Sequence, residues 1–261
     1  TMKCKEIIKK IEEKYPVSFA EEWDNPGLLV GDPEKEVKKV FLALDVTDES
    51  LEEAVKTDAD MIITHHPLIF SGIKKVTEDN FIGRRIIGLI KNDISYYAMH
   101  TNFDVLGMAD LGADYLELTQ REILEVTYDR EGQREGLGRV GNLTKPETLE
   151  DFGRFVKEKL SLPFVKIYGD PDKIVKKAAV CTGSGKSLMP AVLQAGADVY
   201  VTADMDYHSS IDAVAQGVCV IDAGHYGTEY IFMDYMEKEL REMLPELETV
   251  KMKVQHPCKA I

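Results

Sequence analysis

Two adjacent histidines, His65 and His66, stand directly after a short apolar run and before a proline. The run, residues 61–63, has no polar alternation and is too short to be identified as a helix, so it predicts a buried strand. Pro67 ends the strand and favours an extended conformation for His66. The two imidazoles would then lie at the carboxyl end of a central strand, where open α/β sheets bind their ligands. The alternative is a pair of surface histidines in a turn.

Three further side chains of metal-ligating type follow two other predicted strands, residues 94–99 and 218–221. Together with the histidine pair they give three neutral imidazoles and two carboxylates, which are too many donors for one tetrahedral zinc ion. They suit two divalent ions about 3.5 to 4 Å apart, and the strand pleat would direct the adjacent histidines to different ions. Mixed nitrogen and oxygen donors fit Zn, Mn, Fe, Co or Ni without choosing among them. The candidate ligands are His65, His66, Asp104, His225 and Glu229.

The elements that position these ligands follow a strand–helix–strand order. Helical patterns cover residues 4–14, 48–57 and 82–91, and a buried strand covers residues 40–44. A shift of 138 residues aligns residues 37–64 with 175–202 without a gap, and six of the 28 pairs are identical. The same order then continues through a helix to the strand before His225. We therefore expect an α/β protein of two similar βαβ-rich halves, with convergent patterning as the alternative.

The expected domain organisation follows from this repeat. Residues 131–141 are rich in glycine and charge, which is typical of a boundary or surface connector. We expect an N-terminal lobe over residues 1–128, to which the C-terminal tail could add, a connector over 129–138, and a C-terminal lobe over 139–261. Lys145-Pro146-Glu147 predicts the start of a helix that runs to about Leu160.

Composition narrows the class of protein. The 261 residues are 44% hydrophobic and 30% charged, as in an ordinary globular protein with a sizeable core. The net charge of -14 disfavours nucleic acid and anionic membranes as partners. Four cysteines stand far apart, which predicts reduced thiols in a cytoplasmic compartment. No apolar run approaches 18 residues, so we expect no membrane-spanning segment.

Seven stretches follow one another along nearly the whole chain: EEWDNPGLLVGD (21–32), LALDVT (42–47), THHPLIF (64–70), AMHTNFD (98–104), TGSG (182–185), ADMDYHS (203–209) and DAGHYGTE (222–229). In these stretches the chain resembles the family of the Ngg-one-interacting-factor-three-like proteins, often called GTP cyclohydrolase I type 2 homologs. The resemblance implies a three-layer α/β fold of two similar lobes, a dinuclear metal site in the cleft between them and a toroidal homohexamer.

The resemblance also bears on the site and on the length of the chain. By motif, the metal ligands of the family fall on the same five residues. Longer members carry an inserted domain between the lobes, and only about residues 129–138 could occupy that place here. The chain therefore resembles the short form of the family, and whatever the insert contributes is absent.

Other residues could contact a ligand near the metals. His100 could be an acid or base or a donor behind the ligands, with a buried structural histidine as the alternative, and His208 could touch substrate. The stretch 183–187, GSGKS, resembles the end of a P-loop, but Val180 stands where its first glycine should be, so we reject a Walker A motif. The turn could still bind an anion through Gly183, Gly185 and Lys186. Trp23 is expected in the core or a subunit contact, with stacking on a ligand as the disfavoured alternative.

Two classes of function fit these observations. The first is a metal-dependent hydrolase, either GTP cyclohydrolase-like, as the resemblance suggests, or phosphoesterase-like. The second is a non-catalytic metal-binding or regulatory scaffold protein. Two divalent ions against two carboxylates leave a positive site in an acidic protein, so we expect a small anionic, phosphorylated ligand. A toroid that binds DNA is disfavoured by the net charge.

Overall fold

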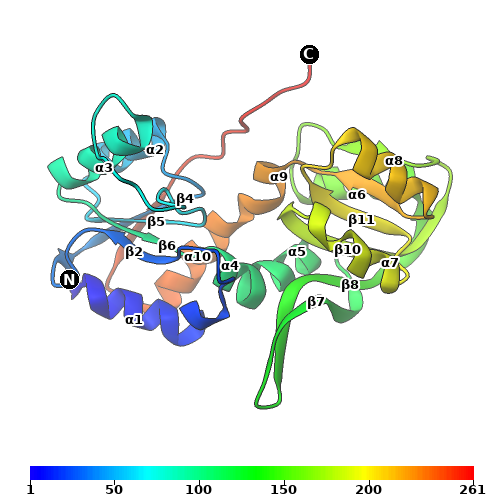
Figure 1. Cartoon of the computed structure of the whole chain (residues 1–261), viewed down its shortest axis with the longest axis horizontal. Coiled ribbons are helices and arrows are strands. Elements are labelled where there is room, and N and C mark those ends of the chain that lie inside the picture. Colours follow the sequence, from blue (N-terminus) through cyan, green and yellow to red (C-terminus); the bar gives the residue numbers. More distant parts are fainter. The chain divides into compact units, whose positions relative to one another are not determined.

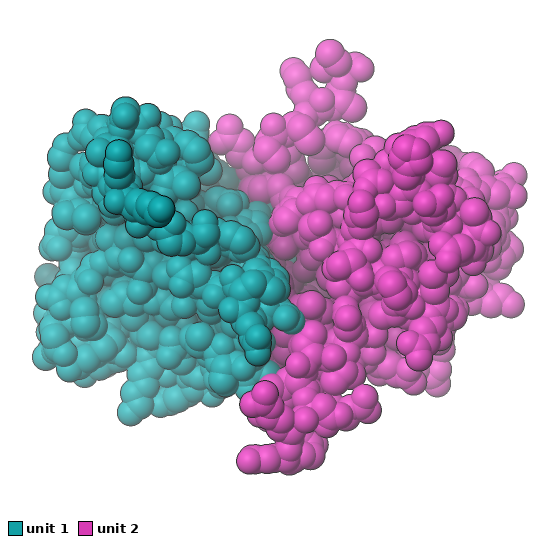
Figure 2. Space-filling model, viewed as in Figure 1, with its two compact units in different colours: residues 1–103, 230–254 teal, residues 104–229, 255–261 magenta.

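The computed structural model describes residues 1–261 and divides the chain into two compact units. Unit 1 holds residues 1–103 and 230–254, and unit 2 holds residues 104–229 and 255–261 (Figure 2). The predicted mixed α/β fold is confirmed. The first boundary differs from the expected lobes 1–128 and 139–261, because the chain leaves unit 1 after residue 103. Residues 230–254 return to unit 1, as expected of the C-terminal tail.

Unit 1 is built on a five-stranded sheet in the order β13-β4-β5-β6-β2. The strands β13, β4, β5 and β6 are parallel, and β2 is antiparallel to β6. A separate pair, β1 and β3, is antiparallel. The strands are β1 (Met2–Lys3), β2 (Gly27–Val30), β3 (Glu36–Val37), β4 (Lys39–Ala43), β5 (Met61–Thr64), β6 (Ser95–Ala98) and β13 (Glu248–Lys251).

Helices cover both faces of this sheet, with α2 and α3 on one side and α1 and α10 on the other (Figure 1). Thr47 caps α2 by accepting a hydrogen bond from the backbone N–H of Ser50, and Asn80 caps α3 in the same way. Burial of Ile7 and Ile11 along one stripe holds α1 on the sheet. The helices are α1 (Cys4–Lys14), η1 (Val17–Phe19), α2 (Asp48–Lys56), α3 (Phe81–Lys91), α4 (Thr101–Phe103) and α10 (Ile231–Met243).

Unit 2 is built on a six-stranded sheet in the order β7-β8-β10-β11-β12-β9. β10, β11 and β12 are parallel, and the other neighbours pair antiparallel. The strands are β7 (Thr119–Arg130), β8 (Gln133–Thr148), β9 (Lys166–Tyr168), β10 (Ile174–Ser184), β11 (Val199–Ala203) and β12 (Cys219–Asp222). The helices are η2 (Asp104–Met108), α5 (Ala109–Tyr115), α6 (Leu149–Lys159), η3 (Lys186–Leu188), α7 (Met189–Gln194), α8 (Tyr207–Ala215) and α9 (His225–Glu229).

The segment predicted to be a surface connector forms a long antiparallel hairpin. Arg130 pairs with Gln133 at its tip, and β8 continues to pair with β10 as far as Thr148 (Figure 1). The helix predicted to begin at Lys145-Pro146-Glu147 was placed too early, because these residues belong to β8 and Thr148 caps α6. Strand pairing thus overrides the helix-start signal of Pro146.

The strand register agrees with the internal repeat. Val40 pairs with Met61 in unit 1, and Ala178 pairs with Val199 in unit 2, which is the same register after the 138-residue shift. One aspartate in each unit fastens this frame. Asp60 Oδ2 accepts the backbone N–H groups of residues 38 and 39, and Asp198 Oδ2 accepts those of residues 176 and 177. The two units therefore present equivalent strand ends.

Candidate metal centre

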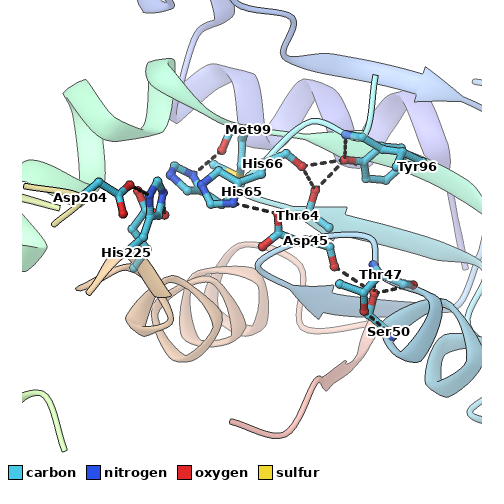
Figure 3. A network of polar contacts seen from close by, with 12 residues as sticks. Asp45, Thr47, Ser50, Thr64, His65, His66, Tyr96, Met99, Asp204 and His225 are labelled. Atoms are coloured by element: carbon cyan, nitrogen blue, oxygen red, sulfur yellow. Dashed lines mark hydrogen bonds and ion pairs between the residues drawn. The ribbon is translucent and has the colours of Figure 1, made fainter. Parts of the chain in front are cut away.

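The double histidine follows the end of β5, as predicted. His65 is fully buried, and its Nδ1 lies 2.9 Å from the backbone oxygen of Met99. His66 Nδ1 lies 3.0 Å from Asp45 Oδ1, at the end of the neighbouring strand β4 (Figure 3). Both rings are therefore oriented through Nδ1, which fixes their tautomers and makes Nε2 the atom that would face a metal.

His100 joins the same group in unit 1. The candidate ligand atoms of His65, His66 and His100 all lie within 4.8 Å of one another. His100 Nδ1 lies 2.8 Å from Asp24 Oδ1, and the other oxygen of Asp24 accepts hydrogen bonds from the backbone and hydroxyl groups of Thr101. This histidine is thus held by a carboxylate, in the same way as His66.

The electrostatics of Asp24 follow from these contacts. Its side chain is fully buried, and burial alone would raise its pKa. The hydrogen bonds from His100 and Thr101 outweigh burial and hold the pKa of Asp24 at about 2. Asp24 is therefore a fixed negative charge behind the histidine group of unit 1.

In unit 2, His225 and Glu229 lie one turn apart on α9, and His225 Nε2 is 3.0 Å from Glu229 Oε2. Asp204, which follows β11, lies 2.6 Å from His225 Nδ1 (Figure 3). Burial works to lower the pKa of His225, but Glu229 and Asp204 raise it to about 9. Two carboxylates around one imidazole make this a position that favours positive charge, whether a proton or a metal ion.

The predicted glycine turn packs directly against these ligands. Gly183 has φ +68°, and a Cβ added to it would lie 3.1 Å from His225 Nε2 and collide with Glu229 Oε1. The backbone N–H of Gly183 donates a hydrogen bond to Thr228 Oγ1 at 2.8 Å. Gly183 is therefore required by a close approach as well as by its backbone conformation.

Asp104 opens η2, a π-helical turn of the kind often found at functional sites. Burial, followed by the negative charges of Asp104 and Glu229, raises the pKa of the Cys181 thiol to about 12. Both carboxylates thus act on the same cysteine of β10. Within unit 2, Glu229 thus has candidate ligand atoms of Asp104 and of His225 within 4.8 Å, and within unit 1 the structure brings His65, His66 and His100 together.

The other predicted residues have structural partners. His208 is exposed on α8 and packs edge-on against Tyr207, with ring centroids 5.1 Å apart. Lys186 forms an ion pair with Asp206. Gly185 accepts a hydrogen bond from the Tyr200 hydroxyl, and a Cβ at Gly185 would strike that hydroxyl. Anion binding by the turn and substrate contact by His208 stay predictions.

Trp23 was expected in the core or a subunit contact. The core is wrong, because the side chain of Trp23 is 59% exposed. A cavity of about 220 Å³ also adjoins His66. The residues that line the cavity are Asp45, Val46, Thr47, His66, Pro67, Leu68, Phe81, Ile82 and Arg85.

Sequence reasoning missed the residues that orient the ligands, chiefly Asp24, Asp45 and Asp204. Two of them carry a usable signal, because Asp45 precedes His66 and Asp204 precedes His225 by the same 21 residues. Asp24 lies 76 residues before His100, so no local spacing could reveal it.

The sequence and the structure of the chain are similar to those of known proteins. The family Duf34/NIF3 (NGG1p interacting factor 3) matches residues 2–257. A GTP cyclohydrolase 1 type 2 homolog of Clostridium perfringens is 37% identical over 246 residues, 93% of each chain, and one of Clostridium acetobutylicum is 35% identical over 249 residues, 95% of this chain and 92% of the other. A crystal structure of a Bacillus cereus protein related to NIF3 superposes with a TM-score of 0.94 at 28% identity, covering 100% of this chain and 99% of the other.

The chain belongs to the Duf34/NIF3 family. Its relatives carry the cyclohydrolase homolog name that the resemblance predicted. None of its helices is both long enough and apolar enough to cross a membrane.

Proposed function

We propose that this protein binds two divalent metal ions through His65, His66, Asp104, His225 and Glu229 and uses them to hydrolyse a small anionic substrate. The two sets of ligands, one in each unit, would meet in a cleft between two similar lobes of a three-layer fold. Zn, Mn, Fe, Co and Ni all suit the donors. When bound, the ions would activate water and stabilise developing negative charge.

One observation carries the proposal: the Nδ1 atom of each candidate histidine ligand has an oxygen partner. His66 and His225 each have an aspartate there, and His65 has a backbone carbonyl. Histidines that ligate metals are held by such carboxylates and carbonyls, which orient the ring and raise its basicity.

The residues of the chain have distinct parts in the proposed reaction. Asp45 and Asp204 would position their histidines, and Gly183 would allow Glu229 and His225 to come together. His100, backed by the ionised Asp24, would hold or move a proton near the substrate. His208 and the Gly183–Lys186 turn would contact the anionic, phosphorylated part of the substrate.

The names of the relatives make ring opening of GTP the first reaction to test. The test is an activity screen of the Zn- and Mn-loaded protein over nucleotides, pterins and phosphoesters, with His65→Ala as the control. We expect turnover that depends on metal and falls at least a hundredfold in the variant. Tight metal binding without turnover on any substrate would instead favour the non-catalytic scaffold.

The proposal extends to the setting of the reaction. We propose that the active form is a toroidal homohexamer in the cytoplasm, a short member of the family without the inserted domain. Light scattering that gives a monomer at micromolar concentration would refute the assembly.

A further inference from the structure

Two large aromatic side chains are exposed beside the histidine group of unit 1. Trp23 is 59% exposed and Phe70 is 52% exposed, and their ring centroids are 5.7 Å apart at an interplanar angle of 46°. The indole of Trp23 also meets the ring of His100 edge-on, at 6.1 Å between centroids. We call Trp23 and Phe70 the aromatic pair.

The two chain segments that carry the aromatic pair are held by hydrogen bonds of the neighbouring residues. Asp24, next to Trp23, holds His100 and Thr101 through three hydrogen bonds. Asn25 Nδ2 donates a hydrogen bond of 2.6 Å to the backbone oxygen of Ile69, next to Phe70. The two segments that carry the aromatic pair are thus fastened to each other and to His100.

Exposed apolar side chains held in this way require an explanation. Scattered surface hydrophobics are ordinary, but adjacent aromatic rings that water covers lose the free energy of burial. Flat aromatic faces beside a group of polar catalytic side chains are typical of sites that stack a planar ring. His100 connects the aromatic pair to His65 and His66, whose ring centroids lie 5.2 and 5.5 Å from it.

We propose that the aromatic pair is a stacking subsite for a planar heteroaromatic ring, such as a purine or pterin, on the substrate. The inference rests on the proposed function, since it names the substrate class of that site. The phosphate end of the substrate would face the metals, and the ring would lie on Trp23 and Phe70. His100, between the two, would contact the part of the substrate that joins them.

Trp23 is the single tryptophan of the chain, so its fluorescence reports this subsite alone. The experiment titrates Zn-loaded protein with guanosine 5′-monophosphate and, in parallel, with ribose 5-phosphate, which has the same sugar phosphate without a ring. We expect quenching by the nucleotide only. Calorimetry should show the nucleotide bound about ten- to a hundredfold more tightly than the sugar phosphate.

Variants then assign the preference to the aromatic pair. Trp23→Leu and Phe70→Leu should each weaken binding of the nucleotide about tenfold or more and leave binding of ribose 5-phosphate unchanged. Trp23→Phe and Phe70→Tyr should restore most of the affinity. Tyr128→Leu, which removes an aromatic ring from the hairpin strand β7, is the matched control and should change neither affinity.

The outcomes separate this inference from the proposed function. Equal affinity for both ligands in a protein that holds two zinc ions would overturn the stacking subsite and leave the metal centre standing. Ring-dependent quenching in a protein that binds no metal would support the subsite and remove the metal centre. If neither ligand changes the fluorescence of Trp23 but dilution of the protein does, Trp23 lies between copies of the chain, and the subsite is overturned.

Discussion

In both units an aspartate pairs with a histidine 21 residues further along the chain, but the pair lies one strand later in unit 2. Asp45 follows β4 and His66 follows β5, whereas Asp204 follows β11 and His225 follows β12. The 138-residue shift puts Asp204 at the place of His66. The same frame therefore carries the same pair at different strand ends.

The residue that replaces Asp45 in unit 2 shows one consequence of this difference. The shift puts Gly183 at the place of Asp45, and Gly183 leaves room for Glu229 and His225. Unit 1 thus offers imidazoles held by carboxylates and, at His65, by a backbone carbonyl, and unit 2 offers a carboxylate and an imidazole packed against the backbone of Gly183. The two frames share their internal hydrogen bonds and differ in a few residues at the strand ends.

The largest effect is expected at Gly183. Gly183→Ala places a Cβ against Glu229 and His225 at φ +68°, so we expect a loss of about 3 kcal/mol or more in the free energy of unfolding and loss of metal binding. Gly196→Ala is the matched control, because Gly196 also has φ +68° but nothing lies within 4 Å of the added Cβ. Urea unfolding of both variants measures the difference, and equal losses would show that the close approach is unimportant.

The orienting aspartates should have matching effects in the two units. Asp45→Asn and Asp204→Asn remove the charge behind His66 and His225, so we expect metal affinity to fall about 10- to 100-fold in each. The thermal stability of the metal-free proteins should change little, since both contacts are partly exposed. Competition with a chelator measures the affinity, and a normal affinity in either variant would mean that its histidine is not a ligand.

The aspartates that accept backbone N–H groups, Asp60 in unit 1 and Asp198 in unit 2, should contribute equally to the free energy of unfolding. Asp60→Ala and Asp198→Ala each remove a carboxylate that accepts two backbone N–H groups, and we expect each to cost about 2 kcal/mol. The Asn variants keep an acceptor and should lose less. Urea unfolding measures the free energy of unfolding of each variant. A loss in only one of the two alanine variants would show that the two frames are held differently.

The smallest effect concerns Asp24, which has no counterpart in unit 2, where Pro163 stands three residues before β9 at the equivalent register position. Its pKa of about 2 lies below its usual 3.8, so the ionised form stabilises the fold above about pH 4. That contribution, at most about 2 kcal/mol, is lost as the pH falls from 4 toward 2. Asp24→Asn in metal-free protein should flatten the pH dependence in this range, and an unchanged slope would contradict the role of Asp24.

The sequence predicted those parts of the fold and site that depend on local pattern. Helix α1 begins and ends where its apolar stripe predicted, and the double histidine follows a buried strand, as the apolar run 61–63 predicted. The long hairpin was missed, because strand pairing between β7 and β8 joins residues whose local signals favour turns. The contact of Asp24 with His100 joins residues far apart in the sequence, which no local pattern encodes.

The central claim is that the five proposed ligands, His65, His66, Asp104, His225 and Glu229, bind two ions. Elemental analysis of protein reconstituted with Zn or Mn and freed of excess metal tests it most directly. We predict close to two metal equivalents per chain in the unchanged protein and fewer in His65→Ala and in Glu229→Gln. A stable value of one equivalent or none, with all five ligands intact, would contradict the account.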